Sequence, residues 1–190
     1  MPKIRTPSRR MKLLPATALV VGAGVGLAYA AGRPSRRQFV KSVTVAAPIS
    51  VVCQALRDLD TYFKLCELPG EQYAVEGCTT VDKTTTFQVV HRLRFGKVIR
   101  TWASRAESDA GDGVVEFCDT FQAWSSDFKI VFRLKRAGEQ RTQVDVVWAA
   151  TGPQWQTLFF SRMGPKQFDI RLAGLKRHCE SVATNHGNLP

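Results

Sequence analysis

The sequence predicts an α+β domain in which a curved antiparallel sheet of about seven strands wraps around a long C-terminal helix, with two short helices after the first strand. Three observations support this prediction. Segments of alternating apolar and polar residues recur between turn residues from position 39 to position 149. Two short segments with helical spacing follow the first of these strands. One long amphipathic segment closes the chain.

The closing segment, residues 166–182, is predicted to be a helix with one apolar face. Its apolar residues recur at steps of four, three, four and three, which places them on one side of a helix: Phe168, Leu172, Leu175, Cys179 and Val182. Gly164-Pro165 supplies a turn and a helix start, after a separate helical segment at 155–163. A one-sided helix that follows a series of strands needs a sheet to cover its apolar face.

The first strand and the two short helices lie between residues 39 and 65. Residues 39–45 alternate and are rich in β-branched side chains, as expected of a strand. Pro48 suits the first turn of a helix, and the apolar residues that follow it have helical spacing. Residues 59–65 are predicted to form the second short helix.

Six further strands are predicted before the closing helix. They lie at residues 72–80, 85–93, 98–104, 114–121, 128–135 and 143–149. Asp109-Ala110-Gly111-Asp112-Gly113 is a strong hairpin signal between two of them. Sequential strands joined by short turns form an antiparallel meander, which indicates one curved sheet.

The basic charge of the chain is concentrated in its N-terminal part. Residues 1–41 hold nine Lys and Arg residues and no acidic residue, so they supply +9 of the net charge of +11 and leave only +2 for the rest. A nucleic-acid-binding domain would carry such charge on its folded surface, among aromatic residues. The distribution therefore argues against a nucleic-acid partner.

Residues 13–32 form an uncharged, largely apolar stretch between basic flanks. Such a stretch is long enough to span a membrane once. It is also compatible with a cleaved export signal, since Ala28-Tyr29-Ala30 has the form of a cleavage site, or with a mitochondrial presequence. We expect a single-pass membrane protein. The predicted organisation is a basic tail (1–12), a transmembrane or signal segment (13–32), a linker (33–37), one domain (38–183) and a tail (184–190).

The motifs of metal, cofactor and nucleophile chemistry are missing from the sequence. Five cysteines without a C-x-x-C pair do not form a disulfide framework or a zinc motif. There is no G-x-S-x-G, no H-E-x-x-H and no P-loop. We therefore expect no catalytic set, no metal and no cofactor, and nothing in the sequence indicates an oligomeric state.

The order of these elements, together with several short motifs, resembles the START-like (SRPBCC, helix-grip) superfamily. Within it, the similarity is to the polyketide cyclase/dehydrase-like and coenzyme-Q-binding members. The resemblance covers residues 38–183 and rests on an opening strand with its Ala-Pro turn, the second short helix, a central hairpin, the last hairpin and the closing helix: 43–52, 56–63, 95–102, 138–144 and 169–180. It implies a helix-grip fold with an apolar cavity between the sheet and the C-terminal helix.

Candidate ligand-binding residues are those expected to face this cavity. Period two places His91 with Phe87 and Val89, where it either contacts a ligand or bonds to a neighbouring strand. Arg100 shares a face with Trp102 and lies inside if that face is inward; the other register turns it outward. The full set is His91, Arg100, Trp102, Phe117, Phe128, Phe132, Trp148, Phe168, Leu172 and Leu175.

Three functions are compatible with these features. The first is membrane-anchored binding or transport of a hydrophobic molecule such as a lipid, an isoprenoid quinone or a polyketide-like ring. The second is an aromatase/cyclase-type enzyme in which polar cavity residues orient a reactive chain, although general acid–base chemistry needs positioned titratable groups. The third is a ligand-free structural partner of a membrane complex.

Overall fold

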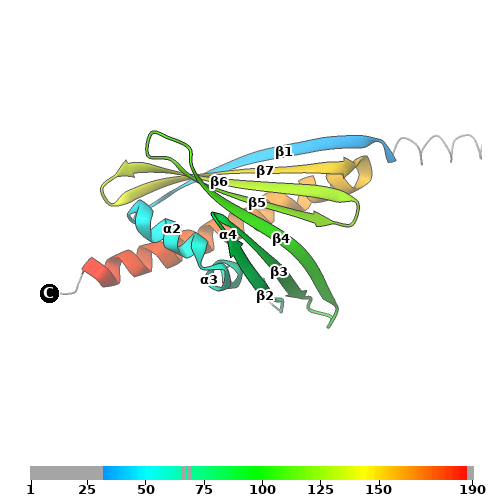
Figure 1. The fold of residues 1–190 in the computed structure, drawn as a ribbon, viewed down its shortest axis with the longest axis horizontal. Coiled ribbons are helices and arrows are strands. Elements are labelled where there is room, and N and C mark those ends of the chain that lie inside the picture. Colours follow the sequence, from blue (N-terminus) through cyan, green and yellow to red (C-terminus); the bar gives the residue numbers. More distant parts are fainter. Residues whose placement is uncertain (1–31, 66, 68–69, 188–190) are drawn as a thin grey trace, which may run out of the picture.

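A computed structural model describes residues 32–65, 67 and 70–187 of the chain. It contains one seven-stranded antiparallel sheet with the strand order β1-β7-β6-β5-β4-β3-β2, which confirms the predicted meander (Figure 1). The elements are β1 (Pro34–Val45), α2 (Ile49–Arg57), α3 (Leu59–Lys64), β2 (Gln72–Val81), β3 (Thr84–Arg92), β4 (Val98–Asp109), β5 (Val115–Ala123), β6 (Ser126–Gly138), β7 (Arg141–Pro153) and α4 (Gln154–Gly187).

The sheet is strongly curved. Figure 1 shows β2, β3 and β4 bending away from β5, β6, β7 and β1, with α2 and α3 beside the bend. The pairing of β4 with β5 runs only from Ala103–Phe121 to Asp109–Val115. The first part of β4, residues 98–102, pairs with β3 alone. The sheet therefore opens between β4 and β5, on the side where α3 lies against β2.

The closing helix is longer than the sequence predicted. The chain forms one continuous helix, α4, so the prediction that Gly164-Pro165 separates two helices is wrong. Proline inside a helix removes one backbone hydrogen bond and is unfavourable on its own. The helix nevertheless continues through Pro165, and Gly164 beside it lies against β1, where a Cβ atom would be 2.9 Å from Cε1 of Phe39. The glycine thus permits a close approach between helix and sheet.

The apolar face of α4 packs on its own sheet, as predicted. Phe168, Leu172, Leu175 and Cys179 are at most 5% exposed, and α4 lies against β1 and β7. Val182, the fifth residue of the predicted face, is only half-buried. The ring of Phe39 stacks on Trp148 with centroids 4.9 Å apart, and its edge meets Phe168 at 5.6 Å. Aliphatic residues of α2, β6 and β7 complete this core.

The helices α2 and α3 are fixed by polar contacts at their ends. Asp58 caps α3, because its carboxylate accepts hydrogen bonds from the Thr61 amide at 3.2 Å and the Thr61 hydroxyl at 2.6 Å. These bonds from Thr61 lower the pKa of Asp58 below its ordinary value. At the start of α2, the Thr142 hydroxyl of β7 donates to the carbonyl of Ala47 at 2.8 Å. The Thr142 bond thus ties the start of α2 to β7, while the Asp58 cap fixes the start of α3.

The structure corrects three expectations about the two ends of the chain. β1 begins at Pro34, so most of the predicted linker at 33–37 is strand, paired with the end of β7. The predicted tail from residue 184 is helical as far as Gly187. The prediction of a single-pass membrane protein is wrong for the part of the chain described here, in which no helix has the length and apolar character to cross a membrane. Residues 13–31, on which that prediction depended, lie outside the described residues.

Candidate ligand-binding site

An apolar pocket of about 160 Å³ lies between α3 and the inner face of the sheet. Its walls are mostly aromatic and aliphatic, with contributions from α3, from five strands and from one residue of α4: Tyr62, Phe63, Tyr73, Phe87, Val89, His91, Ile99, Thr101, Ala103, Asp119, Phe121, Ile130 and Arg171. The cavity therefore lies beside α3, whereas the sequence predicted it between the sheet and the C-terminal helix.

The alternation of strand residues explains which side chains face the pocket. In β3, Phe87 and Val89 point inward and are at most 8% exposed, and His91 follows on the same face. From α3, the ring of Phe63 meets Phe87 edge-on at 6.0 Å and also contacts Tyr73 at 5.9 Å. These rings close the pocket on the α3 side.

His91 is a polar residue in this apolar wall, and the fold supplies a partner for it. Its Nε2 atom lies 2.9 Å from Oε2 of Glu71, in the loop before β2. The imidazole also stacks on the ring of Tyr73 with centroids 4.2 Å apart. About a fifth of the His91 side chain remains accessible to solvent, so the residue lies at the edge of the pocket. Its contact with a ligand stays a prediction.

A buried ion pair lies at the other end of the pocket. Arg105 of β4 and Asp119 of β5 are cross-strand partners, and their side chains are 4% and 7% exposed. Two hydrogen bonds of 2.6 Å join the guanidinium to both carboxylate oxygens. A third donor of Arg105 binds the carbonyl of Leu56 at the end of α2, and the guanidinium lies 4.6 Å from the centre of the Tyr62 ring. The Arg105 guanidinium thus contacts a carboxylate, a backbone carbonyl and an aromatic ring at the same time.

A second hollow of about 320 Å³ lies beyond this ion pair, and its lining is largely charged. It is bordered by Arg57, Lys83, Arg105 and Glu107, together with Leu59, Thr80, Asp82, Thr85 and Phe117. Arg57 donates two hydrogen bonds to Glu107, at 2.9 and 2.5 Å. These bonds lower the pKa of Glu107 and raise that of Arg57.

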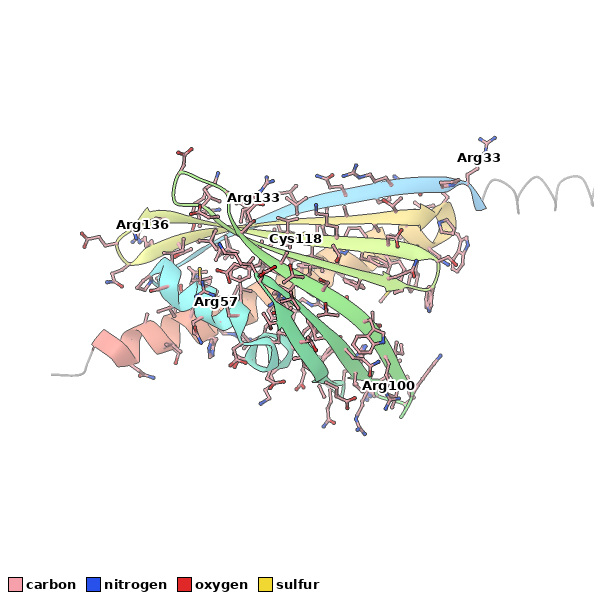
Figure 2. All side chains as sticks on the ribbon, in the orientation of Figure 1. Arg33, Arg57, Arg100, Cys118, Arg133 and Arg136 are labelled. Atoms are coloured by element: carbon pink, nitrogen blue, oxygen red, sulfur yellow. The ribbon has the colours of Figure 1, made fainter. Side chains whose placement is uncertain are left out.

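Two predicted site residues, Arg100 and Trp102, face away from the pocket, so the outward register is the one that the structure has. The inner positions of β4 are Ile99, Thr101 and Ala103. Trp102 is 59% exposed and covers Gly77 on the outer face, where β2 has an irregular register; a Cβ atom at Gly77 would lie 3.7 Å from its ring. Figure 2 shows Arg100 near the start of β4, far from Arg57 on α2.

The other predicted residues are placed in the core or in the charged hollow. Phe117 borders the hollow beyond the ion pair. The remaining six are buried core residues, outside the lining of the apolar pocket: Phe128, Phe132, Trp148, Phe168, Leu172 and Leu175. Because α4 packs directly on β1 and β7, the space between helix and sheet is filled there. Of the ten predicted residues, His91 alone lines the apolar pocket among the described residues.

The sequence analysis did not predict the Arg105–Asp119 ion pair or the part of the pocket wall that α3 forms with Tyr62 and Phe63. Asp119 had a usable signal, since period two places it between Phe117 and Phe121 on the inner face of β5. An acid at such a position needs a buried partner. Arg105 could be recognised as that partner only after the register of β4 against β5 was known.

No protein-family model and no curated protein matches the chain. Solved structures do match. An aromatase/cyclase from a Streptomyces species, Zhui, aligns with a TM-score of 0.62 at 17% identity over 77% of this chain and 94% of its own. A START superfamily protein from Mycobacterium smegmatis aligns with 0.55 at 12% identity, over 76% and 98%. The human StarD13 (DLC2) lipid transfer and protein localization domain aligns with 0.55 at 10% identity, over 85% and 96%.

Similarity to solved structures at 10–17% identity supports the fold of the chain. The seven-stranded curved sheet, the two short helices after β1 and the long closing helix are all present in the described residues. The chain therefore has the helix-grip fold of START-like proteins.

Proposed function

We propose that this protein binds a hydrophobic small molecule in the apolar pocket beside α3. The observation that carries the proposal is the pocket itself, with aromatic and aliphatic walls and few polar groups. An apolar cavity of about 150 Å³ takes up one benzene molecule, whereas drug-sized ligands occupy about 300–1,000 Å³. A pocket of about 160 Å³ thus suits one ring or a short acyl segment, such as part of a polyketide-like molecule, an isoprenoid quinone or a lipid.

The polar residues of the pocket give the ligand an orientation. His91 and Arg171 are both half-buried members of the lining, so they lie where the pocket meets solvent. Arg171 also places its guanidinium 5.2 Å from the centre of the Phe168 ring. A ligand with an apolar body and one oxygen-bearing end would direct that end toward these residues, because a buried oxygen needs a donor.

The structural neighbours support the ligand class. They include an aromatase/cyclase and a lipid transfer domain, whose names refer to ring-forming chemistry and to lipids. A second candidate function is an aromatase/cyclase-type enzyme, and the observation that favours it is the His91–Glu71 contact at the pocket edge. A carboxylate that orients a histidine is a recurring arrangement in general acid–base catalysis. Turnover of a polyketide mimic that His91→Ala abolishes would support this second candidate.

The binding proposal is tested with fluorobenzene as the probe and fluorine NMR as the measurement. Ala103→Phe places a ring inside the pocket and is expected to abolish probe binding, because Ala103 lines it and is 8% exposed. Ala106→Phe on the opposite face of the same strand is the matched control and should bind as the unmodified protein does. A full-length protein that binds neither fluorobenzene nor short fatty acids would refute the proposal and favour a ligand-free structural role.

A further inference from the structure

The Arg105–Asp119 ion pair lies at the boundary between the two hollows. Along β4, the inner residues up to Ala103 line the apolar pocket, while Arg105 and Glu107 border the charged hollow. Along β5, Phe121 faces the apolar pocket and Phe117 the charged hollow.

The same boundary crosses α3, where Tyr62 lines the apolar pocket and Leu59 the charged hollow. The two hollows are therefore neighbours along β4, β5 and α3. The ion pair stands between them.

The pair is held firmly in that position. Both carboxylate oxygens of Asp119 accept hydrogen bonds from Arg105, and the guanidinium also bonds to the carbonyl of Leu56 and packs over Tyr62. Separating two such charges is strongly unfavourable, since each would lose its partner while its side chain remains at least nine-tenths buried. An apolar ligand offers neither charge a replacement.

We propose that the Arg105–Asp119 ion pair closes the inner end of the apolar pocket and thereby limits the length of the hydrophobic ligand that the protein accepts. This inference rests on the proposed ligand-binding function. Each methylene that enters apolar surroundings tightens binding about fourfold. A chain that reaches the pair gains nothing from further methylenes, because the two charged side chains occupy the space between the apolar pocket and the charged hollow.

The first test uses the unmodified full-length protein and straight-chain fatty acids from butanoate to dodecanoate. Their affinities are measured by displacement of fluorobenzene. A pocket of about 160 Å³ holds about six carbons, as in the benzene-sized cavity. Affinity is expected to rise about fourfold per methylene up to about this length and then to stay constant. A continued fourfold rise as far as dodecanoate would overturn the inference.

The second test removes the pair. The double variant Arg105→Ala, Asp119→Ala eliminates both charges together and joins the two hollows. One inward step along a strand is about 7 Å, the length of about five methylenes. In this variant, the affinity is expected to stop rising only at a chain about five carbons longer than in the unmodified protein. Arg105→Leu, Asp119→Leu keeps side-chain bulk without charge and should retain the original length limit.

A matched control removes a cross-strand ion pair that lies elsewhere in the sheet, between Glu116 of β5 and Arg133 of β6. Arg133→Ala, Glu116→Ala eliminates a surface pair whose side chains are 51% and 23% exposed, and it should leave the length limit unchanged.

The outcomes separate the two proposals. Binding of fluorobenzene by the folded alanine variant with an unchanged length limit overturns the closing role of the ion pair and leaves ligand binding standing. Absence of all binding in the unmodified protein overturns the proposed function itself. If the alanine variant does not fold, the length series on the unmodified protein still decides the question.

Discussion

Replacing Asp119 with alanine leaves the Arg105 guanidinium buried without its anionic partner. The burial and hydrogen bonding of Arg105 determine how much the free energy of unfolding should fall. Arg105 is 4% exposed, and the substitution removes both of its 2.6 Å hydrogen bonds to a carboxylate. Its remaining contacts described above are a backbone carbonyl and the face of a tyrosine ring. Removal of one partner from a buried pair lowers the free energy of unfolding by about 3–5 kcal/mol. We expect about 4 kcal/mol here.

Urea unfolding followed by circular dichroism measures this loss. With a denaturant slope of about 2 kcal/mol per molar, the urea midpoint should fall by about 2 M. Glu116→Ala is the matched control on the same strand, because it breaks an exposed pair with Arg133 and should cost less than about 1 kcal/mol.

The double variant Arg105→Leu, Asp119→Leu leaves no unpaired charge. It should recover most of the loss caused by Asp119→Ala, because apolar residues of similar size often replace a buried pair without penalty. If Asp119→Ala is no more destabilising than Glu116→Ala, the reasoning that the pair is a desolvated, mutually dependent unit is refuted.

Three further predictions follow from other parts of the structure. Burial raises the pKa of Cys179 to about 12, so its thiolate fraction at pH 8 is about a thousandfold below that of an ordinary thiol; maleimide labelling with mass-spectrometric detection should modify exposed Cys78 long before it. Gly174→Ala should lower the thermal midpoint, because the new Cβ atom would lie 2.8 Å from the Leu65 carbonyl oxygen, and such overpacking costs about 1–3 kcal/mol. The pKa of Glu107 is lower in the folded state, so its stabilisation is present above the unfolded-state pKa and is lost as pH falls; acid titration should show Glu107→Gln converging with the unmodified protein.

Each of these predictions has its own control. Labelling is best done in a Cys66→Ser background, since Cys66 lies outside the described residues. Equal labelling rates for the buried and exposed thiols would contradict the burial argument. For the helix, Ala173→Gly tests propensity alone at an exposed neighbouring position. A rise in thermal midpoint for Gly174→Ala would show that the helix can move away. For the acid titration, a constant difference between the two proteins from neutral to acid pH would contradict the role of Glu107.

The fold could be predicted because its signals are local. Each strand carries its alternation within its own residues, and the closing helix shows its apolar face in Phe168, Leu172 and Leu175. The helix boundary at Pro165 was predicted wrongly, because the rule that proline ends a helix considers only neighbouring residues. The helix continues through Pro165, and the neighbouring Gly164 packs against Phe39, a contact between distant parts of the chain that a local rule does not include.

The site was harder to predict because it depends on which face of each strand is inward. A large aromatic residue usually marks the inner face, and Trp102 suggested the wrong face of β4. Its ring instead covers Gly77 of β2 on the outside. The inner face carries Ala103 and Arg105, a small residue and a charged one, and neither indicates burial alone. The charge of Arg105 becomes understandable only with Asp119 opposite it, a pairing that register alone determines.

The pairing of the first strand with the last has a consequence for how this protein is made. Ser42 in β1 bonds to Asp145 in β7, 103 positions later, and Lys41 to Asp169 in α4, 128 positions later. At about 5–20 residues per second, a ribosome exposes β1 many seconds before either partner exists. Hairpins from β2 to β6 can form during synthesis, but the apolar residues on the inner face of β1, Phe39, Val43 and Val45, stay uncovered until β7 and α4 have been made. A truncation before α4 should therefore yield an aggregation-prone chain, because β1 cannot join the sheet before β7 has been synthesised and its inner face is not covered before α4 follows.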